Sequence, residues 1–539
     1  MKRLHCFVSV ALFVCFASPL FAAPGDVVAR IPTPASAPTG LAFDGTHLWI
    51  ADRLTDTLYA IDRQSGQVAR ALPAPGFVPL GLTWDGAHLW CIDGEEKRIL
   101  QLDVKTGITL RSLESPTQRP EGLAWDGKYL WLSDGAEDVL CQISTEDGTT
   151  IVSYRAPSGN STGLTYWNGY LWCADRRDDK IFLFDVKHGE VVFGLDAPGK
   201  YARGLTSDGQ HLYVVDYQAD SIFQLVMDDG SPLRVLDTHT LDLALLHEFR
   251  NYGPGEVPTF DAYISIPAIL PNQKLLSEVR FTPPPQEIIR DRWNQPIAHF
   301  RLDNPGLAVR NQVKMEVRAE LSEARTLVFP HRVGKLEEIP ADVRKTYLVD
   351  EDKYRMSDPI IQNAVRAAVG FETNPYWMMR GIHKYIREHL SYELAGGWNV
   401  APKVLERGNG SCSEYTFVFI SMCRAAGIPA RYVGAVVIRG DDASTDEHFH
   451  RWSQVYLPGY GWVHVDPQGG DRDVPAEVAE SIGVVENKFL ITTEGGGASE
   501  YLGWSYNHNE KWTSRGPVKV HVEATGEWSP APQESSAGE

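Results

Sequence analysis

A cysteine in a glycine-rich approach is the residue with the clearest chemical potential in this chain. Cys412 lies within Gly-Asn-Gly-Ser-Cys-Ser-Glu at residues 408–414. Ser411 and Glu414 have the S-x-x-E spacing of a capping box, which predicts that Cys412 is in the first turn of a helix. The positive end of the helix dipole favours a thiolate over a thiol. We therefore expect the pKa of Cys412 to be lowered and its sulfur to be a nucleophile at neutral pH.

An acid/base partner for this thiolate follows further along the chain. Alternating residues at 450–457 and at 462–466 predict two strands, and Pro-Gly-Tyr-Gly at 458–461 predicts the turn between them. In such an antiparallel pair Asp466 falls opposite or diagonal to His450. The carboxylate would then hold the imidazole in one tautomer while the other ring nitrogen faces the thiol. Cys412, His450 and Asp466 are thus the residue types of a nucleophile, a base and an orienting carboxylate.

The same residues carry a resemblance to a known family. The run GSCSEYTFVFISMCRAAGIPARYV, followed by HRWSQVYLPGYGWVHVDP, resembles the core of the transglutaminase-like superfamily, over about residues 355–470. The resemblance implies a circularly permuted relative of the papain-like fold with Cys412, His450 and Asp466 as catalytic residues. It also suggests that Trp398 could reach the oxyanion region, although packing is the simpler role for this residue.

The reaction that this resemblance implies is attack on an amide or acyl carbonyl, with a thioester on Cys412 and release to water or an amine. The backbone N–H of Cys412 is the natural oxyanion donor. Water, at about 55 M, is the default acceptor, so we expect amidase or peptidase activity. Transfer of protein glutamine acyl groups to amines, which cross-links proteins, is the alternative. A non-catalytic secreted adhesion or assembly protein is a second alternative.

Two other interpretations of the residues before His450 compete with this one. His448 lies two residues earlier on the same strand face and is a reserve candidate for the base. The loop also carries four carboxylates that could bind a metal ion: Asp441, Asp442, Asp446 and Glu447. A solvated loop that leads into the strand of His450 is the simpler explanation, and the sequence contains no evident second cluster of ligands. We therefore predict neither a metal nor a cofactor.

The class of protein is restricted by the length of the chain, its net charge and its N-terminal residues. The 539 residues are enough for several domains. Residues 1–23 have the basic, apolar and small-residue regions of a secretory signal, which predicts a periplasmic or extracellular protein with no stable membrane insertion after cleavage. The net charge of −19 argues against nucleic acid as a partner, because a polyanion would be repelled.

Residues 24–237 are dominated by a repeat. A motif that begins Gly-Leu and usually ends Asp-Gly recurs every 41 residues from Gly40, and aromatic and aspartate residues follow at the same interval. A period near 40 with four short strands is typical of β-propeller blades. We predict five blades closed by a strand at 26–31, with six as the alternative. The repeated side chains are assigned to packing and turn capping, and the propeller to binding a protein, peptide or glycan.

The rest of the chain changes pattern twice. Alternating segments at 238–348 predict an immunoglobulin-like β-sandwich. Helical spacing at 358–369 and 375–390 predicts helices that buttress the cysteine helix. Residues 349–528 are assigned to an α+β transglutaminase-like catalytic domain whose C-terminal strands extend its sheet, and residues 529–539 to a tail that need not fold. The predicted fold is therefore multidomain: all-β propeller, β-sandwich, then α+β enzyme domain.

Overall fold

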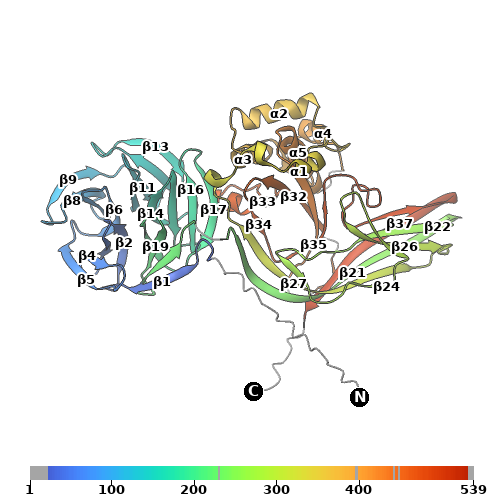
Figure 1. Ribbon diagram of the computed structural model, residues 1–539, viewed down its shortest axis with the longest axis horizontal. Coiled ribbons are helices and arrows are strands. Elements are labelled where there is room, and N and C mark those ends of the chain that lie inside the picture. The colour runs from blue at the N-terminus through green and yellow to red at the C-terminus, as the bar shows by residue number, and fades with distance from the viewer. Residues whose placement is uncertain (1–21, 229–230, 395–397, 441–442, 447–448, 532–539) are drawn as a thin grey trace, which may run out of the picture.

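The computed structural model describes residues 22–228, 231–394, 398–440, 443–446 and 449–531, and within these the protein is mostly β. Figure 1 shows a ring of sheets, coloured blue to green, beside a larger body that has helices above a sheet and long strands at its far end. The predicted secretory signal lies almost wholly outside the described residues. None of the helices in the described ranges is long and apolar enough to span a membrane.

Five antiparallel sheets of four strands make up the N-terminal part. The first two contain β2 (Pro38–Phe43), β3 (His47–Asp52), β4 (Thr57–Asp62) and β5 (Val68–Pro73), then β6 (Pro79–Trp84), β7 (Leu89–Asp93), β8 (Arg98–Leu102) and β9 (Thr109–Glu114). The next two contain β10 (Pro120–Trp125), β11 (Leu130–Asp134), β12 (Val139–Ile143) and β13 (Thr150–Arg155), then β14 (Ser161–Trp167), β15 (Tyr170–Asp175), β16 (Lys180–Asp185) and β17 (Glu190–Asp196).

The fifth sheet joins the start of the described chain to the end of the repeat. It contains β18 (Ala202–Ser207), β19 (His211–Asp216), β20 (Ser221–Val226) and β1 (Val27–Pro32). Strand β1 pairs antiparallel with β20, which is the pairing expected of the segment 26–31. The first strands of successive sheets contact one another, and β18 contacts β2, so the sheets form a closed ring.

The repeated residues serve packing and turns, as the sequence predicts. The buried indole of Trp90 donates its Nε1–H to Asp85 at 2.9 Å. The buried carboxylate of Asp93 accepts backbone N–H groups of two loops at 3.0 to 3.1 Å. A Cβ atom on Gly40 would collide with the backbone of Leu80 in the next sheet, which explains a glycine at this position of the repeat.

Two further antiparallel sheets lie at the far end of the molecule and share a hydrophobic core. One has the order β23-β27-β21-β37-β31, with β24 and β34 also paired to β27. Its strands are β21 (Leu233–Glu256), β23 (Gln273–Leu275), β24 (Arg280–Thr282), β27 (Asn311–Thr326), β31 (Ala443–Asp446), β34 (Val484–Val485) and β37 (Arg515–Pro530). The other, in the order β25-β26-β22-β36, contains β22 (Thr259–Ser265), β25 (Glu287–Arg290), β26 (Pro296–Asp303) and β36 (His508–Trp512).

The last two strands correct the sequence-based assignment. We expected the C-terminal strands to extend the catalytic sheet, but β36 pairs with β22 and β37 pairs with β21. The reason is hydrophobic: Val518, Val520 and Val522 of β37 pack against the core that contains Phe249 and Phe260. Strand β37 also continues two residues past the predicted boundary at 528.

An α+β part lies between the ring and these two sheets. Its sheet has the order β33-β32-β30-β35 and contains β30 (Ala430–Val437), β32 (Phe449–Leu457), β33 (Gly461–Val465) and β35 (Phe489–Gly495). Its helices are α1 (Ala341–Tyr347), α2 (Pro359–Val369), α3 (Pro375–His389), α4 (Ala401–Arg407), α5 (Cys412–Ala425) and α6 (Pro475–Glu480), with the 3-10 turns Pro330–Arg332 and Leu336–Glu338 and the short pair β28 (Ser391–Tyr392) and β29 (Asn409–Gly410). The long strands of the middle region end at Thr326, so the helical part begins before the predicted boundary at 348.

The ring and the helices are packed through one hydrophobic core. Trp377 of α3 is buried, and the His188 ring stacks on it with centroids 3.8 Å apart. Arg380, one turn further along α3, donates to the Val191 carbonyl at 2.8 Å and pairs with Glu190. Because α3 also packs on α5, the ring is attached to the helices that support Cys412.

Candidate active site

Cys412 is the first residue of α5, as the capping-box spacing predicts. The buried carboxylate of Glu414 accepts the backbone N–H of Ser411 at 3.1 Å. It also accepts the backbone N–H of Asn399 at 3.0 Å and the Arg407 guanidinium at 2.9 Å. Glu414 thereby ties the approaching loop and α4 to the first turn of α5, which holds the cysteine at the positive end of the helix dipole.

The hairpin of β32 and β33 brings His450 and Asp466 together. Ser453 pairs with Val465, so Asp466 follows the last paired residue of β33 and lies diagonal to His450. The His450 Nε2 atom is 2.7 Å from the Asp466 Oδ2 atom. The other carboxylate oxygen accepts two backbone N–H groups of the following turn, at 3.1 and 2.9 Å. The carboxylate is therefore fixed from one side and bonded to the imidazole on the other.

The same imidazole is hydrogen-bonded to the Cys412 thiol. Asp466 bonds the Nε2 atom of the ring, which leaves Nδ1 as the ring nitrogen available to the sulfur. The backbone N–H of Arg451 also donates to the sulfur. The structure thus brings Cys412, His450 and Asp466 into one continuous chain of hydrogen bonds.

Their charges depend on one another. Burial raises the pKa of the Cys412 thiol, but the hydrogen bond and the charge of His450 outweigh burial, and the net pKa is lowered. Burial lowers the pKa of His450, but the Asp466 charge and hydrogen bond raise it to about 10. The pKa of Asp466 is lowered despite burial, chiefly by the charge on His450. A thiolate, an imidazolium and a carboxylate are therefore the favoured states at neutral pH.

Aromatic side chains fix the plane of the imidazole. Trp452 and Phe489 both stack near His450, with ring centroids 5.6 and 5.7 Å away. The Trp452 indole donates to His464 Nδ1 at 2.9 Å. Burial lowers the pKa of His464 to about 3, so this second histidine of the sequence motif is neutral and supports Trp452. Of these two histidines, His450 is the one that contacts the cysteine and the aspartate.

A buried guanidinium acts on the charge state of the sulfur, and the sequence analysis did not identify it. Four aromatic rings surround the Arg451 Cζ atom: those of Trp398, Phe417, Tyr432 and Tyr506, with centroids 5.1, 5.2, 4.8 and 4.3 Å away. Arg451 is fully buried, and its Nε and Nη1 atoms have no hydrogen-bond partner among the described residues. Its charge is one of the causes that lower the pKa of Cys412. The only sequence signal was its position next to His450.

Trp398, which we considered for the oxyanion region, lies over this guanidinium. Its side chain is 43% exposed, and its carbonyl accepts a hydrogen bond from Lys353. The backbone N–H of Cys412 remains the oxyanion donor that the position at the helix start favours.

The surface beside the triad is hollowed on the side of Asp466. A cavity of about 200 Å³ is lined by Trp452, Asp466, Arg472, Glu480 and Phe489, among others. Below the loop after Asp466, His383 is fully buried and hydrogen-bonded to Ser481 at 3.2 Å. Burial lowers the pKa of His383 to about 3, so it is a neutral packing residue.

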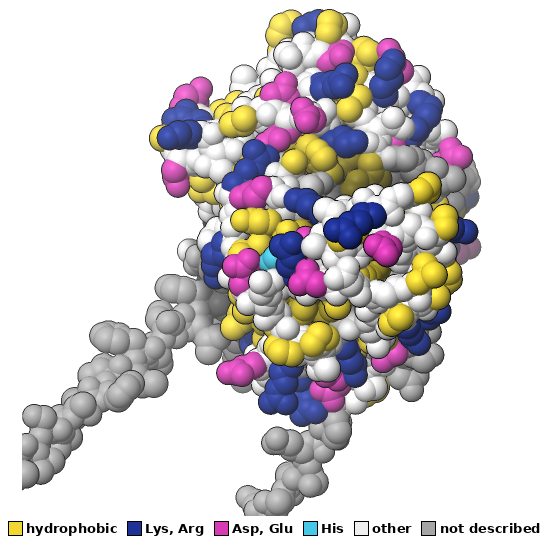
Figure 2. All heavy atoms as spheres, turned by 90° about the vertical axis from the view of Figure 1, so that its right-hand side faces the viewer, with side chains coloured by type: hydrophobic (Ala, Val, Ile, Leu, Met, Phe, Trp, Pro, Cys, Tyr) yellow, Lys and Arg dark blue, Asp and Glu magenta, His cyan; other side chains and the backbone are white. Residues whose placement is uncertain are grey.

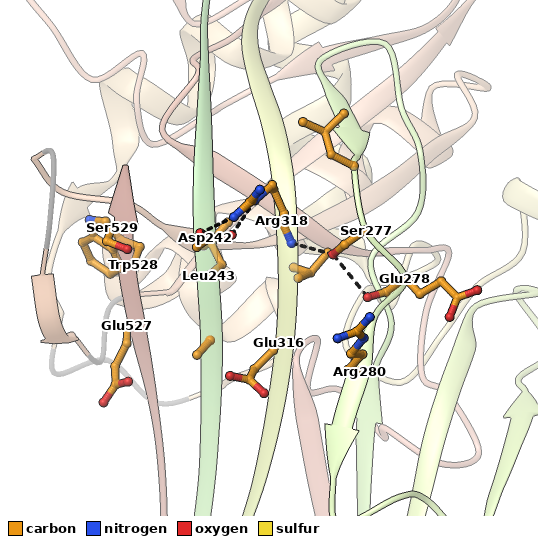
Figure 3. Close-up of a pocket in the computed structure, with 13 residues that line it drawn as sticks. Asp242, Leu243, Ser277, Glu278, Arg280, Glu316, Arg318, Glu527, Trp528 and Ser529 are labelled. Atoms are coloured by element: carbon orange, nitrogen blue, oxygen red, sulfur yellow. Dashed lines mark hydrogen bonds and ion pairs between the residues drawn. The ribbon is translucent and has the colours of Figure 1, made fainter. Parts of the chain in front are cut away.

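A larger hollow of the described surface lies elsewhere. Figure 3 shows this site, about 760 Å³, on the sheet of β21, β27 and β37, where Arg318 forms two bonds to Asp242 at 2.8 and 2.9 Å. None of the triad residues lines it. Figure 2 views this end of the molecule and shows acidic and basic side chains interspersed over it.

The competing interpretations of the loop before His450 stay predictions. His448, Asp441, Asp442 and Glu447 lie outside the described residues, and only the backbone of Asp446 is described. The five cysteines in the described ranges, Cys91, Cys141, Cys173, Cys412 and Cys423, form no disulfide. Burial raises the pKa of Cys423, which is fully buried eleven residues further along α5.

Parts of this chain are similar to known proteins. Residues 362–467 match the family model of the transglutaminase-like superfamily. A stretch of 156 residues is 28% identical to an uncharacterized protein of Haemophilus influenzae, covering 24% of this chain and 42% of that protein's length.

Many solved structures also resemble parts of this chain, including the following two. A proposed cysteine protease from Cytophaga hutchinsonii is 13% identical, with a TM-score of 0.38, and the match covers 56% of this chain and all of the other. The Cps50 (Swd1) β-propeller domain of Myceliophteria thermophila is 12% identical, with a TM-score of 0.28, and that match covers 38% of this chain and all of the other.

Proposed function

Because residues 362–467 form a transglutaminase-like domain, we propose that this chain is a secreted cysteine enzyme that cleaves amide or peptide bonds through a thioester. One observation carries the proposal: a cysteine at a helix start is hydrogen-bonded to His450, which is bonded to Asp466 at 2.7 Å. A structural cysteine would not need this arrangement. The four buried cysteines of the described residues, Cys91, Cys141, Cys173 and Cys423, have raised thiol pKa values, opposite to Cys412.

The reaction begins with attack of the Cys412 thiolate on the carbonyl carbon of the substrate. A carbon–sulfur bond forms, the carbonyl electron pair moves to oxygen, and the backbone N–H of Cys412 stabilises that oxyanion. The His450 imidazolium gives its Nδ1 proton to the leaving nitrogen as the carbon–nitrogen bond breaks. The products of this half-reaction are a free amine and an acyl group on sulfur.

The second half-reaction uses the same base in the opposite direction. The neutral His450 takes a proton from the acceptor, which attacks the thioester carbonyl and releases the thiolate. Asp466 remains ionised and holds the imidazole through Nε2 in both steps. The acceptor determines whether the net reaction is hydrolysis or amine transfer.

Hydrolysis is the acceptor chemistry that we favour. The tryptophans considered as water screens were Trp398 and Trp452. Trp452 is 3% exposed and engaged with His464 and the His450 ring, while Trp398 is 43% exposed over Arg451. Neither observation supports a dry tunnel around the sulfur, and water is abundant wherever it is not excluded. If amine transfer, and thus cross-linking, were found, it would replace hydrolysis in this proposal.

The ring of β-sheets is proposed to bind a protein, peptide or glycan partner. The repeated tryptophans and aspartates are engaged in packing and turns, so a binding role must come from loops that depart from the repeat. Periplasmic or extracellular location is part of the same proposal and rests on the secretory pattern of residues 1–23.

The test is to trap the acyl-enzyme. Wild type and His450→Ala are incubated with an extract of the native compartment, and the mass added to the Cys412 peptide is measured. An acyl adduct that persists longer in His450→Ala supports the thioester. Cys423→Ala serves as the matched control, because it removes the other cysteine of α5 and should leave the adduct unchanged.

A primary amine added to the wild-type enzyme then separates the two acceptors. We expect carboxylic acid as the main product at millimolar amine. Amine incorporation in large excess over acid would make the chain an amine transferase. Absence of any adduct on Cys412 in both proteins, with normal folding, would contradict the enzyme proposal as a whole.

A further inference from the structure

A second cluster of ligating side chains lies outside the triad, where the two far sheets meet. His247 comes from β21, and His508 and Glu510 come from β36. Their ligand atoms all lie within 4.8 Å of one another. We propose that His247, His508 and Glu510 form a binding site for a divalent transition-metal ion of the zinc class. This inference goes beyond the proposed function and does not depend on it.

The geometry of the three side chains suits a small tetrahedral site. One carboxylate oxygen, Oε1 of Glu510, is 2.5 Å from His247 Nε2 and 2.6 Å from His508 Nδ1. The two imidazole rings meet edge to face, with centroids 4.9 Å apart. In a tetrahedral zinc site with bonds of about 2.0 to 2.2 Å, ligand atoms are about 3.3 to 3.6 Å apart. Modest rotations of these side chains would open the cluster to that spacing.

The donor set is also the one that zinc prefers. Two imidazole nitrogens and one carboxylate oxygen leave a fourth tetrahedral position, which water fills in many zinc sites. A cavity of about 20 Å³ adjoins the two histidines and is otherwise lined mainly by apolar side chains such as Leu245, Ile264 and Phe449. That volume is about enough for one water molecule. The structure therefore provides three ligands and room for a fourth.

Burial separates this cluster from a chance group of surface residues. The His247 side chain is 6% exposed, Glu510 is 14% exposed and His508 is 26% exposed. An ion could enter past His508, the most exposed of the three.

The position of the cluster indicates what the metal would do. It would join β21 of one sheet to β36 of the other, two strands about 260 residues apart in sequence, as a structural clamp. The Phe449 ring lies 6.4 Å from the His508 ring, and Phe449 precedes His450 in the chain. We therefore assign the ion to stability of the sheets that adjoin the triad strand, with no part in the chemistry.

The experiment measures binding of Zn²⁺ and Co²⁺ to purified protein without a histidine tag. All proteins carry Cys412→Ala, because the triad itself offers sulfur, imidazole and carboxylate to a metal. The parent is compared with His508→Ala and Glu510→Gln. His521→Ala is the matched control, since His521 is exposed and 3.9 Å from its nearest carboxylate, Glu523.

We expect the parent and His521→Ala to bind one Zn²⁺ per chain, and a Zn²⁺-dependent rise in Tm that both share. His508→Ala and Glu510→Gln should bind more than about 100-fold more weakly and lose the rise in Tm. The Co²⁺ complex should show a tetrahedral absorption spectrum without sulfur-to-metal bands. Glu510→Gln keeps an oxygen that can accept hydrogen bonds from both histidines, so this variant is expected to fold. It therefore tests metal binding even if His508→Ala does not fold.

Two results would overturn the proposal. One is the absence of saturable Zn²⁺ binding by the parent at micromolar metal. The other is equal affinity and equal Tm response in the parent and in Glu510→Gln, which would show that any metal is held elsewhere and that the cluster is a hydrogen-bonded group only.

Discussion

Replacing Asp466 with asparagine tests the coupling of charges in the triad. The asparagine keeps the shape of the side chain and an oxygen that can accept the two backbone N–H groups of the following turn, at 3.1 and 2.9 Å. It removes the negative charge 2.7 Å from His450 Nε2. The imidazolium then loses its main source of stabilisation, and the thiolate loses its positive partner.

The size of the effect follows from electrostatics. Two unit charges about 4 Å apart interact by about 4 kcal/mol at an effective dielectric constant of about 20. At about 1.4 kcal/mol per unit, this is a change of about 3 units in the pKa of His450. The rise from the ordinary 6.5 to about 10 has the same size. The equilibrium between the ion pair and the neutral thiol–imidazole pair should therefore move by about 1,000-fold toward the neutral pair.

The assay is the rate of alkylation of Cys412 by iodoacetamide between about pH 4 and pH 10, because only the thiolate reacts. In wild type the rate should be high well below the pKa of an ordinary thiol. In Asp466→Asn the reactive form should appear only at higher pH, with a rate at about pH 6 that falls by one to three orders of magnitude. Digestion and mass spectrometry separate Cys412 from Cys423, which serves as a slow internal reference.

Glu477→Gln is the matched control. Glu477 lines the same hollow as Asp466 but is exposed, so screening should leave the profile within a few tenths of a pH unit. Identical profiles for wild type and Asp466→Asn, with both proteins folded, would refute the charge coupling.

Four further outcomes follow from the same structure. Cys412→Ala should abolish the acyl adduct while changing the free energy of unfolding in urea by less than about 1 kcal/mol. Arg451→Met should raise the pKa of Cys412 and slow its alkylation at about pH 6, with the fold intact by circular dichroism, because methionine fills the aromatic cage without charge. Arg380→Met should lower the free energy of unfolding by about 3 to 5 kcal/mol, since it leaves Glu190 without its partner at the buried interface. Deletion of residues 22–237 should give an aggregated protein in size-exclusion chromatography, because it uncovers the core that the ring shares with α3.

The local elements of the site could be predicted because their signals lie within a few residues. The capping box placed the start of α5 at Cys412, and the alternation around the turn at 458–461 placed the hairpin that brings Asp466 to His450. The strand register then fixed the diagonal contact, because side chains on a strand alternate with a period of two. The catalytic roles themselves remain predictions until the labelling experiments are done.

Contacts between distant segments could not be predicted in the same way. Arg451 is surrounded by rings from α5, from β30 and from residues 398 and 506, which no local pattern brings together. The partner of β37 depended on which core its valines completed, and two cores were available to them. The ligand cluster of His247, His508 and Glu510 is divided between two strands far apart in the chain.

The repeat nevertheless contains a sequence signal for the interface between the ring and the helices, because one outer strand differs from the others. The outer strands β5 and β9 are exposed at four of their first five positions, whereas β17 is buried at five consecutive positions, Val191 to Leu195. This strand reads Glu-Val-Val-Phe-Gly-Leu-Asp, and it contacts α6, while Phe193 packs edge to face on Phe329 at 5.1 Å. An outer strand with one face in solvent is expected to carry polar side chains on that face, so apolar residues on both faces indicate that the strand is covered. The fourth sheet therefore differs from its neighbours because it is the one that must be covered, and the part of the chain that covers it carries Cys412.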